Sequence, residues 1–162
     1  MNNFETHINS VNEAATLYVK TFTQLDVAKS FGLQDLLDDK LMLIKAIRKG
    51  IPFTLFNEIK NITPFSDDDW AEILSVSTKS LQRYKQKKDF LFKPIHSEKI
   101  IEIAEVSLVG NVVFGDSSKF KLWLNTPSYA LGNMLPIELL KDSYGKEMVL
   151  AELHRIDHGI FA

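Results

Sequence analysis

The fold is decided by residues 65–85, which read FSDDDWAEILSVSTKSLQRYK. Ser66 followed by three aspartates predicts the start of a helix, because the hydroxyl can cap exposed amides and the acids suit the positive helix end. A second helix is expected over about 78–88, after the short turn Ser75-Val76-Ser77. Ala71 is small enough to let two helices cross closely. This spacing is that of a helix-turn-helix.

The two expected helices have an inward and an outward face. The inward face would hold the large apolar side chains of the stretch, namely Trp70, Ile73, Leu74, Val76, Leu81 and Tyr84. The outward face of the second helix would carry polar side chains at i, i+3, i+4 and i+7, namely Lys79, Gln82, Arg83 and Gln86. Arginine and lysine suit guanine or phosphate, and glutamine suits adenine. The hydroxyls of Ser77, Thr78 and Ser80 stand at the amino end, where they can donate to phosphate, and we expect all seven residues to bind DNA.

Two further features bear on DNA binding. Turns of this kind favour glycine at the position of Ser75, because the backbone there tends to the left-handed region, and serine is expected to cost up to about 1 kcal/mol. The net charge of −2 does not indicate a polyanionic partner, but residues 77–99 hold seven basic and two acidic side chains. A mixed solvated surface would explain this block equally well if it did not coincide with the second helix.

Composition restricts the class of protein. The 162 residues allow one ordinary domain or two small ones packed together, and 45% hydrophobic with 25% charged residues is typical of a globular chain. The absence of cysteine excludes disulfides and thiolate metal sites. The start lacks a secretion signal, and the most apolar region, 100–114, is broken by Glu102 and Glu105. We therefore expect a cytoplasmic protein that does not span a membrane.

The remaining chain is predicted to be all-α. Helices are expected over 11–28, 35–49, 52–61, 98–114, 118–124, 136–140 and 145–157. The helix over 35–49 rests on apolar residues spaced by three and four, namely Leu36, Leu37, Leu41, Ile44 and Ile47. The β-branched residues at 106–113 make a strand the competing prediction. The stripe formed by Glu98, Glu102 and Glu105 favours a helix that is buried on most of its surface.

The chain ends in an apolar tip. A helix that stops at Gly159 leaves Ile160, Phe161 and Ala162 beyond it. These residues either fold back onto their own core or fill a partner's pocket, where burial of Phe161 would contribute about 1.5–3 kcal/mol.

Motifs for chemistry are weak. His154 and His158 have the spacing of two metal ligands on a helix, but no third ligand is near in sequence. The sequence has no glycine-rich phosphate loop and no serine nucleophile motif. We expect no metal, no cofactor and no catalysis.

These residues resemble a known family. Residues 65–85 resemble the helix-turn-helix of Xre-type regulators, and the C-terminal stretch resembles the toxin-binding domain of Xre/ParS-group antitoxins from RES-Xre type II toxin-antitoxin modules. The resemblance covers 50–162, about 70% of the chain. Its sharpest motifs are Trp123-Leu124-Asn125-Thr126-Pro127, Ala130-Leu131-Gly132, Pro136-Ile137-Glu138-Leu139-Leu140 and Arg155-Ile156-Asp157-His158-Gly159-Ile160-Phe161.

The resemblance implies a division of labour along the chain. In that family the antitoxin neutralises an NAD-degrading toxin with a RES domain and represses its own operon, usually as a homodimer. The implied parts are a helical region of open role at 1–49, a helix-turn-helix DNA-binding domain with a scaffold helix at 50–114, and a toxin-binding domain at 115–162. The implied toxin-binding residues are Asn125, Pro127, Leu131, Gly132, Arg155, His158, Gly159, Ile160, Phe161 and Ala162.

The chain departs from the family pattern at four positions. Tyr129 stands where proline is frequent, Asn133 where a second glycine is, Met134 where arginine is, and Asp157 where glutamate is. Without that arginine, a charged contact with the toxin at 134 is not expected. The alternative function is a stand-alone Xre-type repressor whose C-terminal domain only dimerises, and a third is an adaptor that does not bind DNA. Co-purification with the product of the adjacent gene separates the first two, and promoter binding separates the third.

Overall fold

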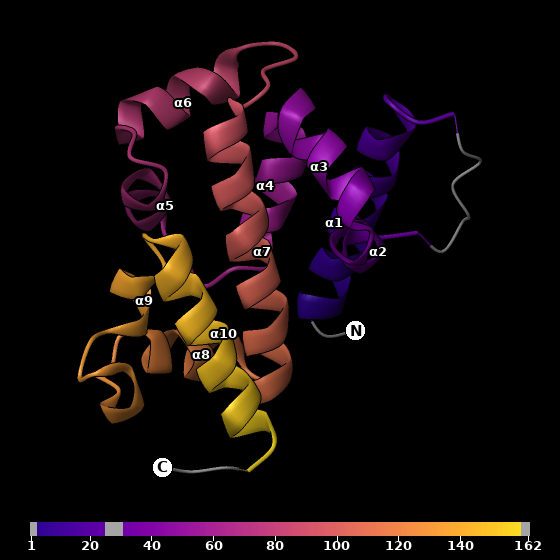
Figure 1. Cartoon of the computed structure of the whole chain (residues 1–162). Helices are drawn as coiled ribbons and strands as arrows, with labels where there is room; N and C mark the ends of the chain where they lie inside the picture. The colour runs from indigo at the N-terminus through magenta and orange to yellow at the C-terminus, as the bar shows by residue number, and fades with distance from the viewer. Residues whose placement is uncertain (1–2, 25–30, 160–162) are drawn as a thin grey trace. The chain divides into compact units, whose positions relative to one another are not determined.

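The computed structural model describes residues 3–24 and 31–159, and these ranges are mostly helical (Figure 1). The described residues contain two isolated β-bridges and no strand. In chain order the helices are α1 (Asn3–Lys20), α2 (Leu33–Asp38), α3 (Lys40–Lys49), α4 (Phe53–Asn61), α5 (Asp67–Ile73), α6 (Thr78–Gln86), α7 (Pro94–Phe114), α8 (Ser117–Leu124), the short 3-10 helix η1 (Tyr129–Leu131), α9 (Pro136–Leu139) and α10 (Ser143–Asp157). The prediction of an all-α fold is confirmed.

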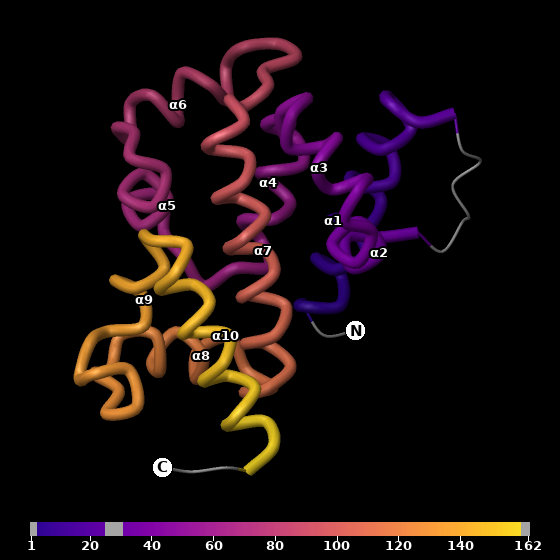
Figure 2. Tube along the Cα trace, viewed as in Figure 1, coloured from indigo at the N-terminus to yellow at the C-terminus, as the bar shows by residue number. Residues whose placement is uncertain are grey.

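The chain forms two compact units, which are described separately. The first unit comprises the described residues of 1–62 together with 79–101, and the second comprises 63–78 together with 102–159. Figure 2 follows the trace from α4 through α5 to α6, and then along α7, whose residues belong to both units. The three domains expected at 1–49, 50–114 and 115–162 stay a prediction.

In the first unit, α1 packs against α2 and α4, and α2 packs against α3. The buried side chains of α1 and α4 are Val11, Ala15, Tyr18, Val19, Leu55, Phe56 and Ile59. Tyr18 donates its hydroxyl hydrogen towards the carbonyls of Ala46 and Gly50, at 2.9 and 2.7 Å. Burial raises the pKa of this hydroxyl, so it stays protonated and able to donate. This contact ties α1 to the end of α3.

Two helices differ from their predicted bounds. The helix expected over 11–28 is α1, which begins at Asn3 and ends at Lys20, while 25–28 lie outside the described residues. The hydroxyls of Thr21 and Thr23 donate to the carbonyls of Tyr18 and Val19, which satisfies the last turn of α1.

The prediction of a single helix over 35–49 was wrong, because the structure divides this stretch between α2 and α3. Asp39 has an extended backbone, and its carboxylate accepts a hydrogen bond from the amide of Met42, which caps α3. Leu36 and Leu37 are buried as expected, but Leu41 is 74% exposed and Ile44 is 44% exposed. The break changes which face of α3 is turned inward.

The helix α7 confirms the helical prediction over the competing strand. It runs without interruption from Pro94 to Phe114 and stops before Gly115, whose φ of +63° suits a residue without a Cβ. Its buried residues include Ile100, Ile101, Ile103, Ala104 and Val106. Ile95 and Val112, near its two ends, are 73% and 75% exposed.

In the second unit, α9 packs against α8 and α10, and η1 packs against α10. Close approaches depend on two glycines, because a Cβ at Gly110 would overlap the ring of Phe120 and one at Gly145 would overlap the carbonyl oxygen of Leu139. The ring of Phe120 is fully buried and stacks on Phe114, with ring centroids 5.9 Å apart. A 2.6 Å ion pair between Lys146 and Glu105 joins α10 to α7.

Candidate functional site

The first helix of the helix-turn-helix starts at the cap that the sequence predicts. The amide of Asp69 donates to the Ser66 hydroxyl at 3.1 Å, and the amide of Ser66 donates to the Asp69 carboxylate at 2.8 Å. This reciprocal pair is a capping box, which satisfies two amides at the start of α5. Trp70, Ile73 and Leu74 are buried, in agreement with the predicted inward face, and the small Ala71 is buried as well.

The turn after α5 has the left-handed residue that the sequence predicts. Ser75 has a φ of 53°, and its amide donates to the carbonyl of Glu72 at 3.0 Å. The amide of Val76 donates to the carbonyl of Ala71 at 2.9 Å. These two bonds around a left-handed residue form a Schellman motif, which fixes the direction in which the chain leaves α5.

The second helix, α6, presents the expected polar face. Lys79, Gln82, Arg83 and Gln86 are all exposed, as is Ser77, whereas Thr78 and Ser80 are half-buried. The guanidinium of Arg83 donates to the hydroxyl of Ser80 at 3.3 Å. The structure therefore brings the seven predicted DNA-binding residues onto α6 and the residue before it, with their longest side chains in solvent.

The opposite side of α6 is held by aromatic packing within the first unit. Leu81 is buried, and the ring of Tyr84 stacks on Phe90 with centroids 4.2 Å apart. Phe92 meets Tyr84 edge-on at 5.8 Å and is itself almost fully buried. Sequence reasoning found Leu81 and Tyr84 but not Phe90 and Phe92, because the two phenylalanines follow the helix in a segment without periodicity. Such packing fixes the rotation of α6 about its axis.

The predicted toxin-binding residues fall into two groups in the second unit. Asn125 and Thr126 close α8 through side-chain hydrogen bonds to the carbonyls of Lys121 and Leu122. Asn125, Pro127 and Gly132 are exposed, whereas Leu131 is only 4% exposed and packs inside the unit. Leu131 is therefore not presented to a partner in this conformation.

The second group lies at the end of α10. Arg155 makes a 2.9 Å ion pair with Glu152 one turn earlier, and both are partly buried. A ring nitrogen of the exposed His158 lies 2.6 Å from the carbonyl oxygen of His154, and Gly159 follows with a φ of +70°. The expected residues Ile160, Phe161 and Ala162 lie outside the described residues.

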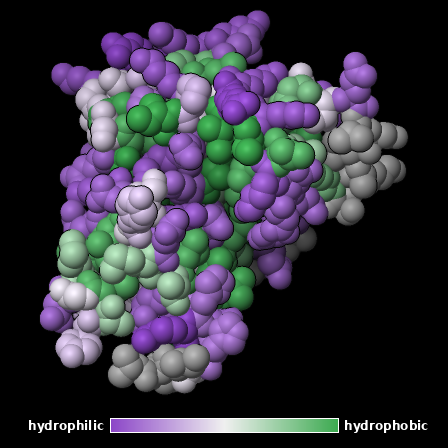
Figure 3. Space-filling view, in the orientation of Figure 1, coloured by the Kyte–Doolittle hydropathy of each residue, from purple (hydrophilic) through white to green (hydrophobic). Residues whose placement is uncertain are grey.

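The second unit also exposes large side chains that the sequence reasoning did not assign to the site. Tyr129 and Tyr144 are each 84% exposed, and Leu122, Met134 and Met148 are 68%, 49% and 46% exposed. Apolar residues at this surface are coloured green around the segments that Figure 1 labels α9 and α10 (Figure 3). Tyr129 and Met134 occupy two of the positions where the family pattern has other residues. This departure was the signal in the sequence that could have indicated the exposed side chains.

The described residues contain neither a metal cluster nor a membrane-spanning helix. Within 3–24 and 31–159, no group of three or more His, Asp or Glu side chains could hold a metal ion. None of the described helices is long and apolar enough to cross a membrane.

Two family models together match most of the chain. A family described as the antitoxin Xre-like helix-turn-helix domain matches residues 42–105, and a family described as the antitoxin Xre/MbcA/ParS C-terminal toxin-binding domain matches 110–159. The chain belongs to the Xre antitoxin family. The Xre-like domain covers most of α3, all of α4 to α6 and the first part of α7. The toxin-binding domain covers the end of α7 and the helices α8 to α10. These domains imply DNA and a toxin as partners.

Two curated relatives of this Xre-family chain are named Antitoxin Xre. The protein from Yersinia enterocolitica serotype O:8 / biotype 1B is 26% identical over 75% of this chain and 82% of its own length. The protein from Photorhabdus laumondii subsp. laumondii is 28% identical over 70% of this chain and 77% of its own length. Helices α1 and α2 lie outside both matched domains.

Proposed function

We propose that this Xre-family antitoxin neutralises an NAD-degrading RES-domain toxin through its C-terminal domain and represses its own operon through its helix-turn-helix. Two matched domains in this order support the pairing of the two roles. The protein would act in the cytoplasm as a non-enzymatic regulator, and as a homodimer it would read two half-sites in the operator.

The observation that carries the DNA-binding part is the exposed face of α6. Lys79, Gln82, Arg83 and Gln86 share that face, while Leu81 and Tyr84 hold the other side of the helix. Arginine and glutamine have the hydrogen-bonding groups that read guanine and adenine in the major groove. Ser77, Thr78 and Ser80 at the amino end of α6 would donate to phosphates and set its register.

The toxin-facing surface would combine the exposed loop residues with the end of α10. Asn125, Pro127 and Gly132 are exposed in the loop region, and His158 and Gly159 are exposed at the helix end. In this proposal Arg155 orients the end of α10, and the tip Ile160-Phe161-Ala162 enters the toxin. The tip would supply the apolar side chains of Ile160 and Phe161, which suit a hydrophobic pocket of the toxin.

The DNA-binding part is tested by titrating the chain with its own promoter fragment at several salt concentrations. Arg83→Ala should weaken binding by about 5- to 150-fold, because one base or phosphate contact contributes about 1–3 kcal/mol. Lys121→Ala is the matched control, because Lys121 is exposed on α8 and outside the proposed interface. Equal affinity and salt dependence for Arg83→Ala and the unaltered chain would contradict this part.

The toxin-binding part is tested by co-expression with the product of the neighbouring gene. A stoichiometric complex with a RES-domain protein is the expected result. Promoter binding without such a complex would instead support a stand-alone repressor whose C-terminal domain only dimerises. The complex should persist for Arg83→Ala, since that residue belongs to the other surface.

A further inference from the structure

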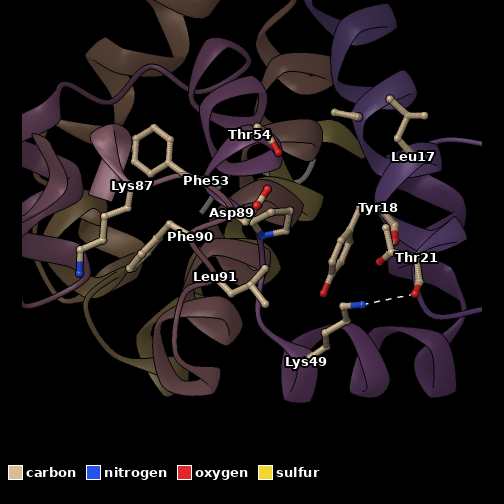
Figure 4. Close-up of a pocket in the computed structure, with 12 residues that line it drawn as sticks. Leu17, Tyr18, Thr21, Lys49, Phe53, Thr54, Lys87, Asp89, Phe90 and Leu91 are labelled. Carbon is tan, nitrogen blue, oxygen red and sulfur yellow. Dashed lines mark hydrogen bonds between the residues drawn. The ribbon is translucent and has the colours of Figure 1, made fainter. Parts of the chain in front are cut away.

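The first unit contains an open pocket of about 500 Å³ beside α1 (Figure 4). Its lining includes cationic, anionic and hydroxyl side chains, namely Lys49, Lys87, Asp89 and Thr54. Because both signs of charge line one open space, the pocket selects no class of ligand. The outer face of α10, in the second unit, has a more uniform chemistry.

The rotation of α10 about its axis is fixed by contacts on its inner side. Val149 and Leu153 are fully buried there. Gly145 lies so close to α9 that an added Cβ would overlap the carbonyl oxygen of Leu139. Because this side is packed, the opposite side of α10 is presented to solvent in a defined orientation.

A stripe of side chains runs along that opposite side. Its members are spaced alternately by four and three positions, which places them on one face of a helix, and they are Tyr144, Met148, Ala151, Arg155 and His158. Arg155 is half-buried and the other four are exposed, with Tyr144 at 84% and Met148 at 46%. Tyrosine and methionine are side chains that protein interfaces favour, so this stripe has the composition of a surface that a partner covers.

The charge beside the stripe is negative. Glu147 is exposed next to Met148, and it has no ion-pair partner among the described residues, unlike Glu138 and Glu152. The second unit as a whole holds twelve acidic and five basic side chains, counted over 63–78 and 102–162. A partner that complements the stripe therefore combines an apolar groove with a cationic side chain.

We propose that the toxin covers this stripe and so binds along the outer face of α10, not at its end alone. The inference rests on the proposed function, because it extends the toxin-facing surface of that proposal. Two of the residues proposed to face the toxin, Arg155 and His158, continue the same stripe towards the end of the chain. The whole of α10 also lies within the match to the toxin-binding domain at 110–159.

The stripe assigns a chemistry to the toxin's contacting face. Tyr144 and Met148 would enter an apolar groove, where large side chains contribute most to binding. Glu147 would meet a lysine or arginine at the edge of that groove, which speeds association more than it adds affinity. Ala151, between Met148 and Arg155, is small enough to let an element of the toxin approach the helix closely.

The test measures binding of the full chain to the purified toxin encoded by the neighbouring gene, by biolayer interferometry. Tyr144→Ala and Met148→Glu should each raise the Kd at least about tenfold. Glu147→Lys should slow association about tenfold at low salt and change dissociation little. The matched control is Leu41→Glu, which should leave the Kd unchanged, because Leu41 is 74% exposed as well but lies outside both matched domains.

The outcomes separate this inference from the proposed function. Tight binding by the unaltered chain, with unchanged affinity for either Tyr144→Ala or Met148→Glu, would overturn this inference and leave the proposed function standing. No binding by the unaltered chain would overturn both. Variants that keep their affinity for the toxin but convert a dimer into monomers in analytical ultracentrifugation would overturn the inference in favour of a second copy as the partner.

Discussion

Replacement of Ser75 tests the link between the turn sequence and the helix-turn-helix geometry. Ser75 sits at a φ of 53°, between the two hydrogen bonds that close the Schellman motif after α5. Its exposed side chain carries no core packing, so substitutions there act mainly through the backbone. We expect stability to follow the order glycine, asparagine, serine and valine at this position, because that is the order of tolerance for the left-handed region.

The size of the effect follows from two opposing terms. A residue with a Cβ costs about 1–2 kcal/mol in the left-handed region, and glycine recovers this cost. Glycine also gives the unfolded chain more conformational freedom, which costs about 0.5–1 kcal/mol. Ser75→Gly should therefore stabilise the protein by up to about 1.5 kcal/mol, or raise its Tm by up to about 6 °C for a chain of this size.

Chemical denaturation followed by far-UV circular dichroism measures this order. The matched control is Ser10→Gly, because Ser10 lies in the middle of α1, where the same exchange should destabilise by about 0.5 kcal/mol. The opposite signs at positions 75 and 10 are the distinctive result. If Ser75→Gly destabilised the protein as much as Ser10→Gly, the left-handed turn would be refuted.

Three other predictions concern particular contacts. Gly145→Ala should destabilise the second unit by about 1–3 kcal/mol, because the added Cβ would overlap the backbone carbonyl of Leu139. An unchanged Tm in thermal unfolding would contradict this close approach. Tyr18→Phe should cost about 1–2 kcal/mol in denaturant titrations, because the buried carbonyl of Gly50 loses its hydroxyl donor; a neutral effect would show that this bond contributes nothing. Burial, assisted by the charge of Lys93, lowers the pKa of His96, so the unfolded chain binds a proton more readily than the folded chain. The free energy of unfolding should therefore fall as the pH drops below about 6.5, and His96→Gln should lessen that fall. An identical pH dependence of Tm in the variant and the unaltered chain would contradict this assignment.

The local elements of the helix-turn-helix could be predicted because each is set by neighbouring residues. The Ser66 cap, the left-handed Ser75 and the outward face of α6 depend on spacing within one or two turns. The long helix α7 was predictable as well, since its charged stripe outweighed the preference of its β-branched residues for strands.

The features that the sequence missed depend on packing between distant segments. The break at Asp39 competes with an apolar spacing that continues across it, and only the tertiary structure leaves Leu41 in solvent. Burial of Leu131 likewise comes from packing of η1 against α10. The pocket beside α1 joins residues more than seventy positions apart, for which a single sequence carries no local pattern.

The central claim is that the chain has one surface for DNA and a separate one for the toxin. A single growth assay tests it, in cells that express the cognate toxin together with the unaltered chain, Arg83→Ala, or a chain that lacks Ile160-Phe161-Ala162. The account predicts that Arg83→Ala protects as well as the unaltered chain when all three are supplied at equal levels from a foreign promoter, while the shortened chain loses protection. Full protection by the shortened chain, or loss of protection with Arg83→Ala at equal protein level, would contradict it.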